Sequence, residues 1–145
     1  MPAKFYEKDI KSGLGEKRKL SAYIDTLIRR HIPGVRSEHI NYIFCNDEYL
    51  HKINKEFLSH DSYTDIITFD LSEKPKELKA EIYISIDRVK ENAEKFITTY
   101  EEELHRVIFH GALHLCGFGD KKDADKKEMR RQEYLCLKEY FKGNS

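Results

Sequence analysis

Short segments of alternating pattern, separated by amphipathic segments, leave this chain few folds to choose from. Within residues 40–44 and 82–86 every second side chain is a large apolar one, and this period of two predicts β-strands. Residues 66–71 and a short stretch at 4–6 are two further predicted strands. Because helices and a few strands interleave, the pattern predicts an α/β-like or α+β class, and we expect an α+β fold. A small mixed β-sheet of about four strands would pack with about five helices.

Five segments carry apolar residues at the three- and four-residue spacing of amphipathic helices. They cover residues 16–32, 48–57, 87–98, 100–116 and 124–141. Asn46 and Asp47 are placed to cap the second of these helices, and Asp87 to cap the third. With 145 residues, no internal repeat and no low-complexity linker, the chain is predicted to form one domain over residues 1–145.

The composition argues against a membrane protein and favours a cytoplasmic one. Hydrophobic residues make up 39% of the chain and aromatic residues 12%, which is enough for a core. No stretch approaches the roughly 20 apolar residues that a membrane-spanning helix needs. Residues 1–8 lack the apolar run of a secretory signal, so we expect the protein to work in the cytoplasm. Cys45, Cys116 and Cys136 form no CxxC pair and are expected to be free thiols.

Two histidines with a glycine-rich turn after them form the most informative pattern. His110 and His114 are four residues apart on a predicted helix, so they share one face with Cβ atoms roughly 5–6 Å apart. Two imidazoles at this spacing can bind one metal ion, at roughly 2.0–2.1 Å each for zinc. Gly117 and Gly119 allow the chain to turn back, which can bring Asp120 to the metal as a third ligand. Three protein ligands and an open fourth position are typical of a catalytic metal.

This pattern has simpler explanations as well. Seven histidines in 145 residues give one such spacing by chance in about one of three such sequences, so an unliganded pair in a cleft wall is one alternative. For Asp120 the alternatives are a helix cap or a solvated turn residue. Gly111 follows His110 at the position where HExxH metalloproteases carry their general base, so a protease of that type is disfavoured.

The same segment resembles the metal-binding signature of the YbeY-type endoribonucleases, H-G-x-L-H-L-x-G-[YF]-D-H. Residues 110–120 match it without gaps at seven positions. Residues 53–57 and 64–69 resemble the family's LNxxYR…T[DN]VL[ST]F stretch, and residues 80–85 resemble its GDIxIS strand. The resemblance spans about residues 40–133, and it implies a metal site at the end of a helix, in a cleft.

The resemblance implies a metal-dependent, single-strand-specific endoribonuclease that acts in ribosomal RNA processing. The implied roles are 3′-end maturation of the small-subunit RNA and ribosome quality control. One divalent ion per chain, most simply Zn²⁺, would be held by His110, His114 and Asp120, and the two histidines would serve catalysis through the metal. The implied partners are single-stranded ribosomal RNA and the small ribosomal subunit. Two alternatives stay open: another metallohydrolase on the same scaffold, and a ribosome-assembly binding factor with a structural metal.

Two departures from the family pattern affect the expected site. Asp120 stands where the family has a third histidine, and a carboxylate oxygen makes manganese or magnesium less implausible than an imidazole would. Leu58 stands where the family has an arginine that is expected to face the substrate phosphate. Lys55 and His60 are nearby candidates to replace it, although both can equally be solvated surface residues. Glu133 matches a glutamate of the family, to which the sequence alone assigns no role.

The net charge of zero counts against an RNA-binding protein until its distribution is considered. Residues 1–31 carry a net charge of +4, residues 32–119 carry −6 and residues 120–145 carry +2. The acidic middle contains both histidines of the expected metal site. The basic first helix can present Arg29 and Arg30 to phosphates, so we expect modest, salt-sensitive RNA binding that involves them.

Overall fold

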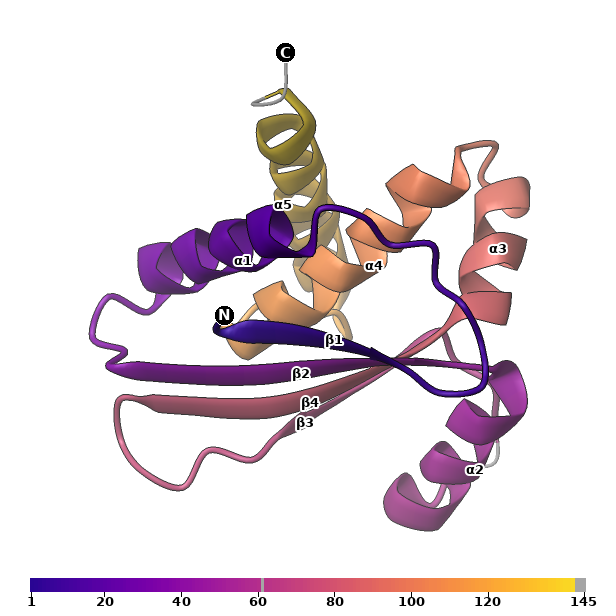
Figure 1. The fold of residues 1–145 in the computed structure, drawn as a ribbon, viewed down its shortest axis with the longest axis horizontal. Coiled ribbons are helices and arrows are strands. Elements are labelled where there is room, and N and C mark those ends of the chain that lie inside the picture. The colour runs from indigo at the N-terminus through magenta and orange to yellow at the C-terminus, as the bar shows by residue number, and fades with distance from the viewer. Residues whose placement is uncertain (61, 143–145) are drawn as a thin grey trace.

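Nine helices and strands build the computed structural model, which describes residues 1–60 and 62–142 (Figure 1). In chain order these elements are β1 (Ala3–Glu7), α1 (Lys17–His31), β2 (Ser37–Cys45), α2 (Asp47–Leu58), β3 (Ile66–Asp70), β4 (Glu77–Ser85), α3 (Ile86–Lys95), α4 (Tyr100–Leu115) and α5 (Asp123–Lys142). Four strands and five helices confirm the predicted α+β class. Residues 61 and 143–145, which the predicted single domain includes, lie outside the described part.

The four strands form one mixed sheet in the order β1-β2-β4-β3. The two central strands, β2 and β4, are parallel and pair from Ser37 opposite Glu77 to Cys45 opposite Ser85. β1 adds to β2 in parallel, and β3 adds to β4 in the antiparallel direction. The edge strands are only five residues long each, so the central pair supplies most of the sheet's backbone hydrogen bonds.

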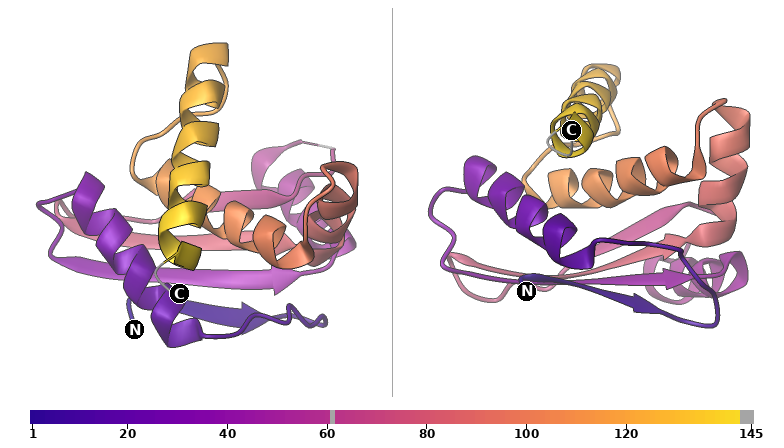
Figure 2. Two further views of the ribbon diagram at one scale, coloured as in Figure 1. Left: turned by 90° about the horizontal axis from the view of Figure 1, so that it is seen from above. Right: turned by 45° about the horizontal axis from the view of Figure 1, so that its top comes forward.

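One face of this sheet is covered by α1 and α4, and α5 crosses above both helices (Figures 1 and 2). Ile82 and Ile84 of β4 point into this layer and belong to the main hydrophobic core. The buried hydroxyl of Tyr42 on β2 donates to the carbonyl of Ile108 on α4, with the oxygens 2.9 Å apart. None of the helices in residues 1–60 and 62–142 combines the length and the apolar surface that crossing a membrane requires.

The opposite face of the sheet carries α2. Leu50 and Ile53 of this helix pack with Cys45 and Ile67 in a second, smaller cluster. Successive side chains of a strand point to opposite faces, so Ile66 packs in the main core while Ile67 packs under α2. α2 and α4 are therefore separated by the sheet. Side chains of α2 do not lie on the same face of the sheet as the histidines of α4.

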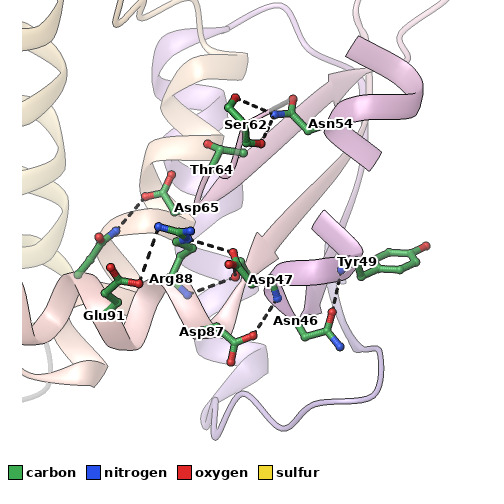
Figure 3. A network of polar contacts seen from close by, with 12 residues as sticks. Asn46, Asp47, Tyr49, Asn54, Ser62, Thr64, Asp65, Asp87, Arg88 and Glu91 are labelled. Carbon is green, nitrogen blue, oxygen red and sulfur yellow. Dashed lines mark hydrogen bonds and ion pairs between the residues drawn. The ribbon is translucent and has the colours of Figure 1, made fainter. Parts of the chain in front are cut away.

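The junction between β4 and α3 differs from the sequence-based prediction, which extended the strand to Ile86 and capped the helix with Asp87. The N-cap lies two residues earlier, at Ser85, whose hydroxyl accepts a hydrogen bond from the Arg88 amide at 3.2 Å. The Asp87 carboxylate instead accepts from the Asp47 amide, at 2.8 Å, in the first turn of α2. Asp47 in turn binds Arg88, with Oδ1 and Nε 3.0 Å apart, so the first turns of α2 and α3 are tied together (Figure 3).

Glu38 is a buried carboxyl group beneath the C-terminal end of α1. Its side chain is 1% exposed, and Arg29 Nη2 lies 3.2 Å from its Oε2. Arg29 also binds Asp25, with Nε and Oδ1 2.8 Å apart. Burial and the neighbouring Asp25 raise the pKa of Glu38 to about 8, although Arg29 opposes the change. Burial therefore favours the uncharged form of Glu38 more than exposure at the surface would.

The free energy of unfolding of the Glu38→Gln variant is expected to rise, relative to that of wild type, as pH rises. The folded-state pKa of Glu38 lies above its ordinary value of 4.5, so wild-type stability falls as pH rises from about 5 through 8, and glutamine does not titrate. We expect the difference in free energy of unfolding to change by about 4 kcal/mol between pH 5 and pH 9 in urea titrations. Glu56→Gln on the exposed side of α2 is the control. A difference that does not vary with pH would contradict the argument.

Candidate metal centre

α4 lies directly on the sheet because a glycine follows His110. A Cβ atom at Gly111 would lie 3.0 Å from Ile82 Cδ1 and 3.1 Å from Ile66 Cδ1. Both isoleucines belong to or pack against the main core, where space is limited. Gly111 therefore lets the helix backbone approach β3 and β4 closely, and this approach sets the height of His110 above the sheet.

A glycine turn after α4 returns the chain to His110. Gly117 has φ +103° and its amide donates to the His114 carbonyl at 3.0 Å. The Phe118 amide donates to the Leu113 carbonyl at 3.1 Å, which completes the hydrogen-bond pattern of a Schellman motif. Beyond this turn Asp120 approaches the helix again, and its Oδ2 lies 3.3 Å from His110 Nε2.

The other ring nitrogen of His110 is held by a chain of buried charges. His110 Nδ1 and Glu133 Oε2 are 2.6 Å apart, and because a carboxylate can only accept, Nδ1 carries the proton. Glu133 Oε1 accepts from Arg106 Nη1 at 2.9 Å. Arg106 also donates two bonds to Glu103, from Nε at 2.8 Å and from Nη2 at 2.7 Å. Both glutamates are buried, so this chain fixes the ring of His110 with Nε2 toward Asp120.

The pKa shifts of these groups follow from their surroundings. Burial lowers the pKa of His110, but the hydrogen bond to Glu133 and the charge of that carboxylate outweigh it, so the pKa is raised overall. Burial also opposes the charge of Arg106, and the bonds to Glu103 and Glu133 again raise its pKa. Glu133 therefore lies between two groups whose positive charge it stabilises.

The loop before β3 carries a further carboxylate, that of Asp65, which hydrogen bonds hold in place (Figure 3). Asn54 at the end of α2 donates its Nδ2 to the Ser62 carbonyl at 2.8 Å. The Asp65 carbonyl accepts from the Ser85 amide at 2.9 Å, and the Asp65 carboxylate accepts from Asn92 Nδ2 at 3.3 Å. Held in this way, Asp65 Oδ2 lies 3.9 Å from Nη2 of Arg106, which α4 supplies.

The structure brings two of the three predicted metal ligands together. His110 and Asp120 are in contact, whereas the side chain of His114 is exposed one turn further along α4. Among the described residues, His114 makes no side-chain hydrogen bond or ion pair. Residues 1–60 and 62–142 contain no group of three or more His, Cys, Asp or Glu side chains arranged to hold a metal ion.

The two predicted substrate-binding residues near Leu58 lie on the other side of the sheet. Lys55 is exposed on α2, and the His60 amide donates to the Asn54 carbonyl at 3.2 Å just after this helix. No hydrogen bond or ion pair among the described residues connects either of them with His110. They stay predictions, because no observation on RNA binding tests them.

The two predicted phosphate-binding arginines of α1 are paired with carboxylates. Arg29 binds Asp25 and Glu38, as described above, and Arg30 Nη2 lies 3.0 Å from Glu139 on α5. A neighbouring ring contact, 5.1 Å between the centroids of His31 and Phe118, joins this end of α1 to the turn after α4. Arg29 and Arg30 thus lie near the glycine turn, with much of their charge neutralised.

Sequence reasoning missed Arg106 and gave Glu133 no role. The spacing of Glu103, Arg106, His110 and His114 contains a usable signal, since steps of three, four and four residues put all of them on one helix face. A polar stripe that ends in two histidines is unusual on a helix that packs against a sheet. Glu133 is 23 residues from His110 and only the tertiary fold brings them together.

The fold and the site together define a class: an α+β protein with a histidine–carboxylate centre at the C-terminal end of a helix that packs on a mixed sheet. A family model described as Endoribonuclease YbeY matches residues 7–141. The chain belongs to the YbeY family, which confirms the resemblance found in its sequence.

Individual relatives agree with this assignment. The protein is 43% identical over 133 residues to the endoribonuclease YbeY of Cytophaga hutchinsonii, covering 92% of each chain. It is 42% identical over 137 residues to that of Parabacteroides distasonis, covering 94% of each chain. The solution structure of TM1509 from Thermotoga maritima superposes with a TM-score of 0.63 at 27% identity, covering 97% of this chain and 90% of the other.

Glu133→Ala is expected to lower the free energy of unfolding by about 2–3 kcal/mol. The substitution leaves Nδ1 of His110 without its acceptor and removes one of the carboxylates that bind Arg106. Urea unfolding at pH 7 measures the loss, with Glu128→Ala as control, because Glu128 is partly exposed and pairs with Arg131 of the same helix. Equal losses in both variants would show that the contacts of Glu133 with His110 and Arg106 add nothing to the free energy of unfolding.

Proposed function

We propose that this protein is a metal-dependent endoribonuclease that cuts single-stranded ribosomal RNA in the cytoplasm. Its task would be maturation of the 3′ end of the small-subunit RNA, together with ribosome quality control on that subunit. Membership of the YbeY family supports the endoribonuclease activity. The observation that carries the proposal is the orientation of His110, whose Nδ1 is held by buried Glu133 while Nε2 faces Asp120.

This arrangement fits a metal site in its chemistry. A histidine that binds a metal commonly donates its second ring N–H to a carboxylate, which fixes the tautomer and the ring orientation. The contact between His110 and Glu133 has this form. We assign His110, Asp120 and the exposed His114 as the residues that would hold one divalent ion, most simply Zn²⁺. When bound, such an ion polarises a phosphate oxygen and lowers the pKa of bound water.

The residues around this site have separate tasks. Glu133 accepts the Nδ1 proton of His110 and keeps Nε2 available as a ligand. Arg106 holds Glu133 from the other side and is itself anchored by Glu103. Asp120 contributes an oxygen donor with a negative charge, which tolerates Mn²⁺ or Mg²⁺ better than an imidazole does.

His114→Ala tests the proposed activity without disturbing the core, because His114 is exposed. We expect purified wild-type protein to contain about one divalent ion per chain and to cleave single-stranded RNA. The variant should match the melting temperature of metal-free wild type, bind no metal when it is supplied, and lose at least about 100-fold in cleavage rate. Elemental analysis, thermal unfolding and cleavage of a labelled RNA are the measurements.

Other outcomes of the same experiment separate the alternatives. Metal-free protein that still cleaves RNA would contradict the metal site. Metal-loaded protein that binds RNA without cleaving it would indicate an assembly factor with a structural metal. Metal-dependent hydrolysis of small phosphodiesters with RNA untouched would indicate a different metallohydrolase.

Asp120→His is expected to shift the metal preference toward zinc. The substitution exchanges a hard oxygen donor for an imidazole, and we expect zinc to bind about tenfold more tightly relative to manganese. Competition between the two ions, followed by elemental analysis, measures the change. Asp125→His is the matched control. Asp125 lies close to Gly119, the residue before Asp120, but forms no ion pair with His110 in the described chain. An unchanged preference would show that Asp120 is no ligand.

A further inference from the structure

A pocket of about 220 Å³ opens beside His110 and Asp120, and two cations of α5 line it. Lys126 and Arg130 are four residues apart, so they project from the same face of this helix. Met129 lies between them in sequence, is 2% exposed and belongs to the main core. The packing of Met129 therefore anchors the helix face that presents the two cations to the pocket.

The third cation that lines the pocket, Arg106, is already engaged. Its guanidinium binds Glu103 and Glu133, which are both buried. Lys126 and Arg130 differ, because neither forms an ion pair with any residue of the described chain. Arg131, next to Arg130 but on another helix face, pairs with Glu128 at 3.0 Å. Of the three cations that line the pocket, Lys126 and Arg130 are thus the two whose charge is available to a ligand.

We propose that Lys126 and Arg130 bind a backbone phosphate of the RNA substrate in this pocket, next to His110 and Asp120. The proposal rests on the proposed endoribonuclease function. A guanidinium can donate two parallel hydrogen bonds to a phosphate, and an ammonium adds a compact positive charge. Neither group recognises a base, so this contact positions the strand without selecting its sequence.

The pocket also explains how this chain can bind substrate without an arginine at position 58. Leu58 is 41% exposed at the end of α2, a helix whose Leu50 and Ile53 pack on the opposite face of the sheet from α4. A leucine cannot bind a phosphate. α5 reaches the site from the same side as His110, because Glu133 of this helix already contacts that histidine. The phosphate contact is therefore supplied by α5.

The double variant Lys126→Gln/Arg130→Gln tests this site against Lys127→Gln/Arg131→Gln. Both remove two positive charges from the same two turns of α5, so they change the net charge equally, and only the first pair lines the pocket. The probe is a short single-stranded 2′-O-methyl oligonucleotide, whose binding is followed by fluorescence anisotropy over a range of salt concentrations. Thermal unfolding confirms that both variants fold.

We expect the pocket variant to bind about tenfold more weakly at low salt. Its slope of log K against log salt should be shallower by about 0.7, since the pocket binds one phosphate and each phosphate contact on a single strand contributes about 0.7. In RNA cleavage the KM should rise while kcat changes little. The control should differ from wild type less than about twofold, and Arg130→Lys should restore part of the affinity.

Two results would overturn the proposal. One is an unchanged salt slope in the pocket variant, and the other is an equal loss of affinity in the control, which would indicate general electrostatic attraction by α5. Failure of the proposed function is seen separately, as wild-type protein that cleaves no RNA. In that case the comparison of binding between the two variants still decides whether the pocket holds a phosphate.

Discussion

A row of largely buried charges runs from Glu103 through Arg106 and Glu133 to His110. It determines how α5 packs on α4. Removing these groups from water is costly, and the cost is offset only because each charge meets an opposite one at hydrogen-bond distance. Apolar side chains of similar size could hold α4 and α5 together equally well. What they could not do is orient an imidazole, and this supports a role for the chain in the chemistry of the site.

This row can act on His110 only because α4 itself is held in place. Gly111 lets the helix backbone approach the sheet, and the Tyr42 hydroxyl binds the Ile108 carbonyl from β2. The turn at Gly117 then sends the chain back past the end of the helix toward α5. α4 therefore carries both histidines and Glu103, the first carboxylate of the row. It is fixed to the sheet at Ile108 and Gly111.

The sequence was sufficient for features that depend on local periodicity. Alternation and helical spacing predicted all nine elements, and the glycines after His114 predicted a turn. Prediction failed where a polar side chain finds a partner far along the chain. Asp87 looked like the cap of its own helix but accepts from the Asp47 amide in the first turn of α2, and Glu38 could not be recognised as a partner of Arg29. Glu133 is the same kind of case, because only tertiary packing places it at His110.

Whether a cation can bind a phosphate depends on whether its charge is already paired with a carboxylate. The number of cations in a segment matters less. Arg29 and Arg30 carry the basic character of the N-terminal segment, yet both are paired with carboxylates, so a phosphate would have to compete for them. Lys126 and Arg130 belong to a segment with a smaller net charge and have no such competitor in the described chain. A protein with zero net charge can therefore bind a polyanion at one place, provided that its unpaired cations gather there. Here the fold gathers them by the same packing of α5 on α4 that brings Glu133 to His110.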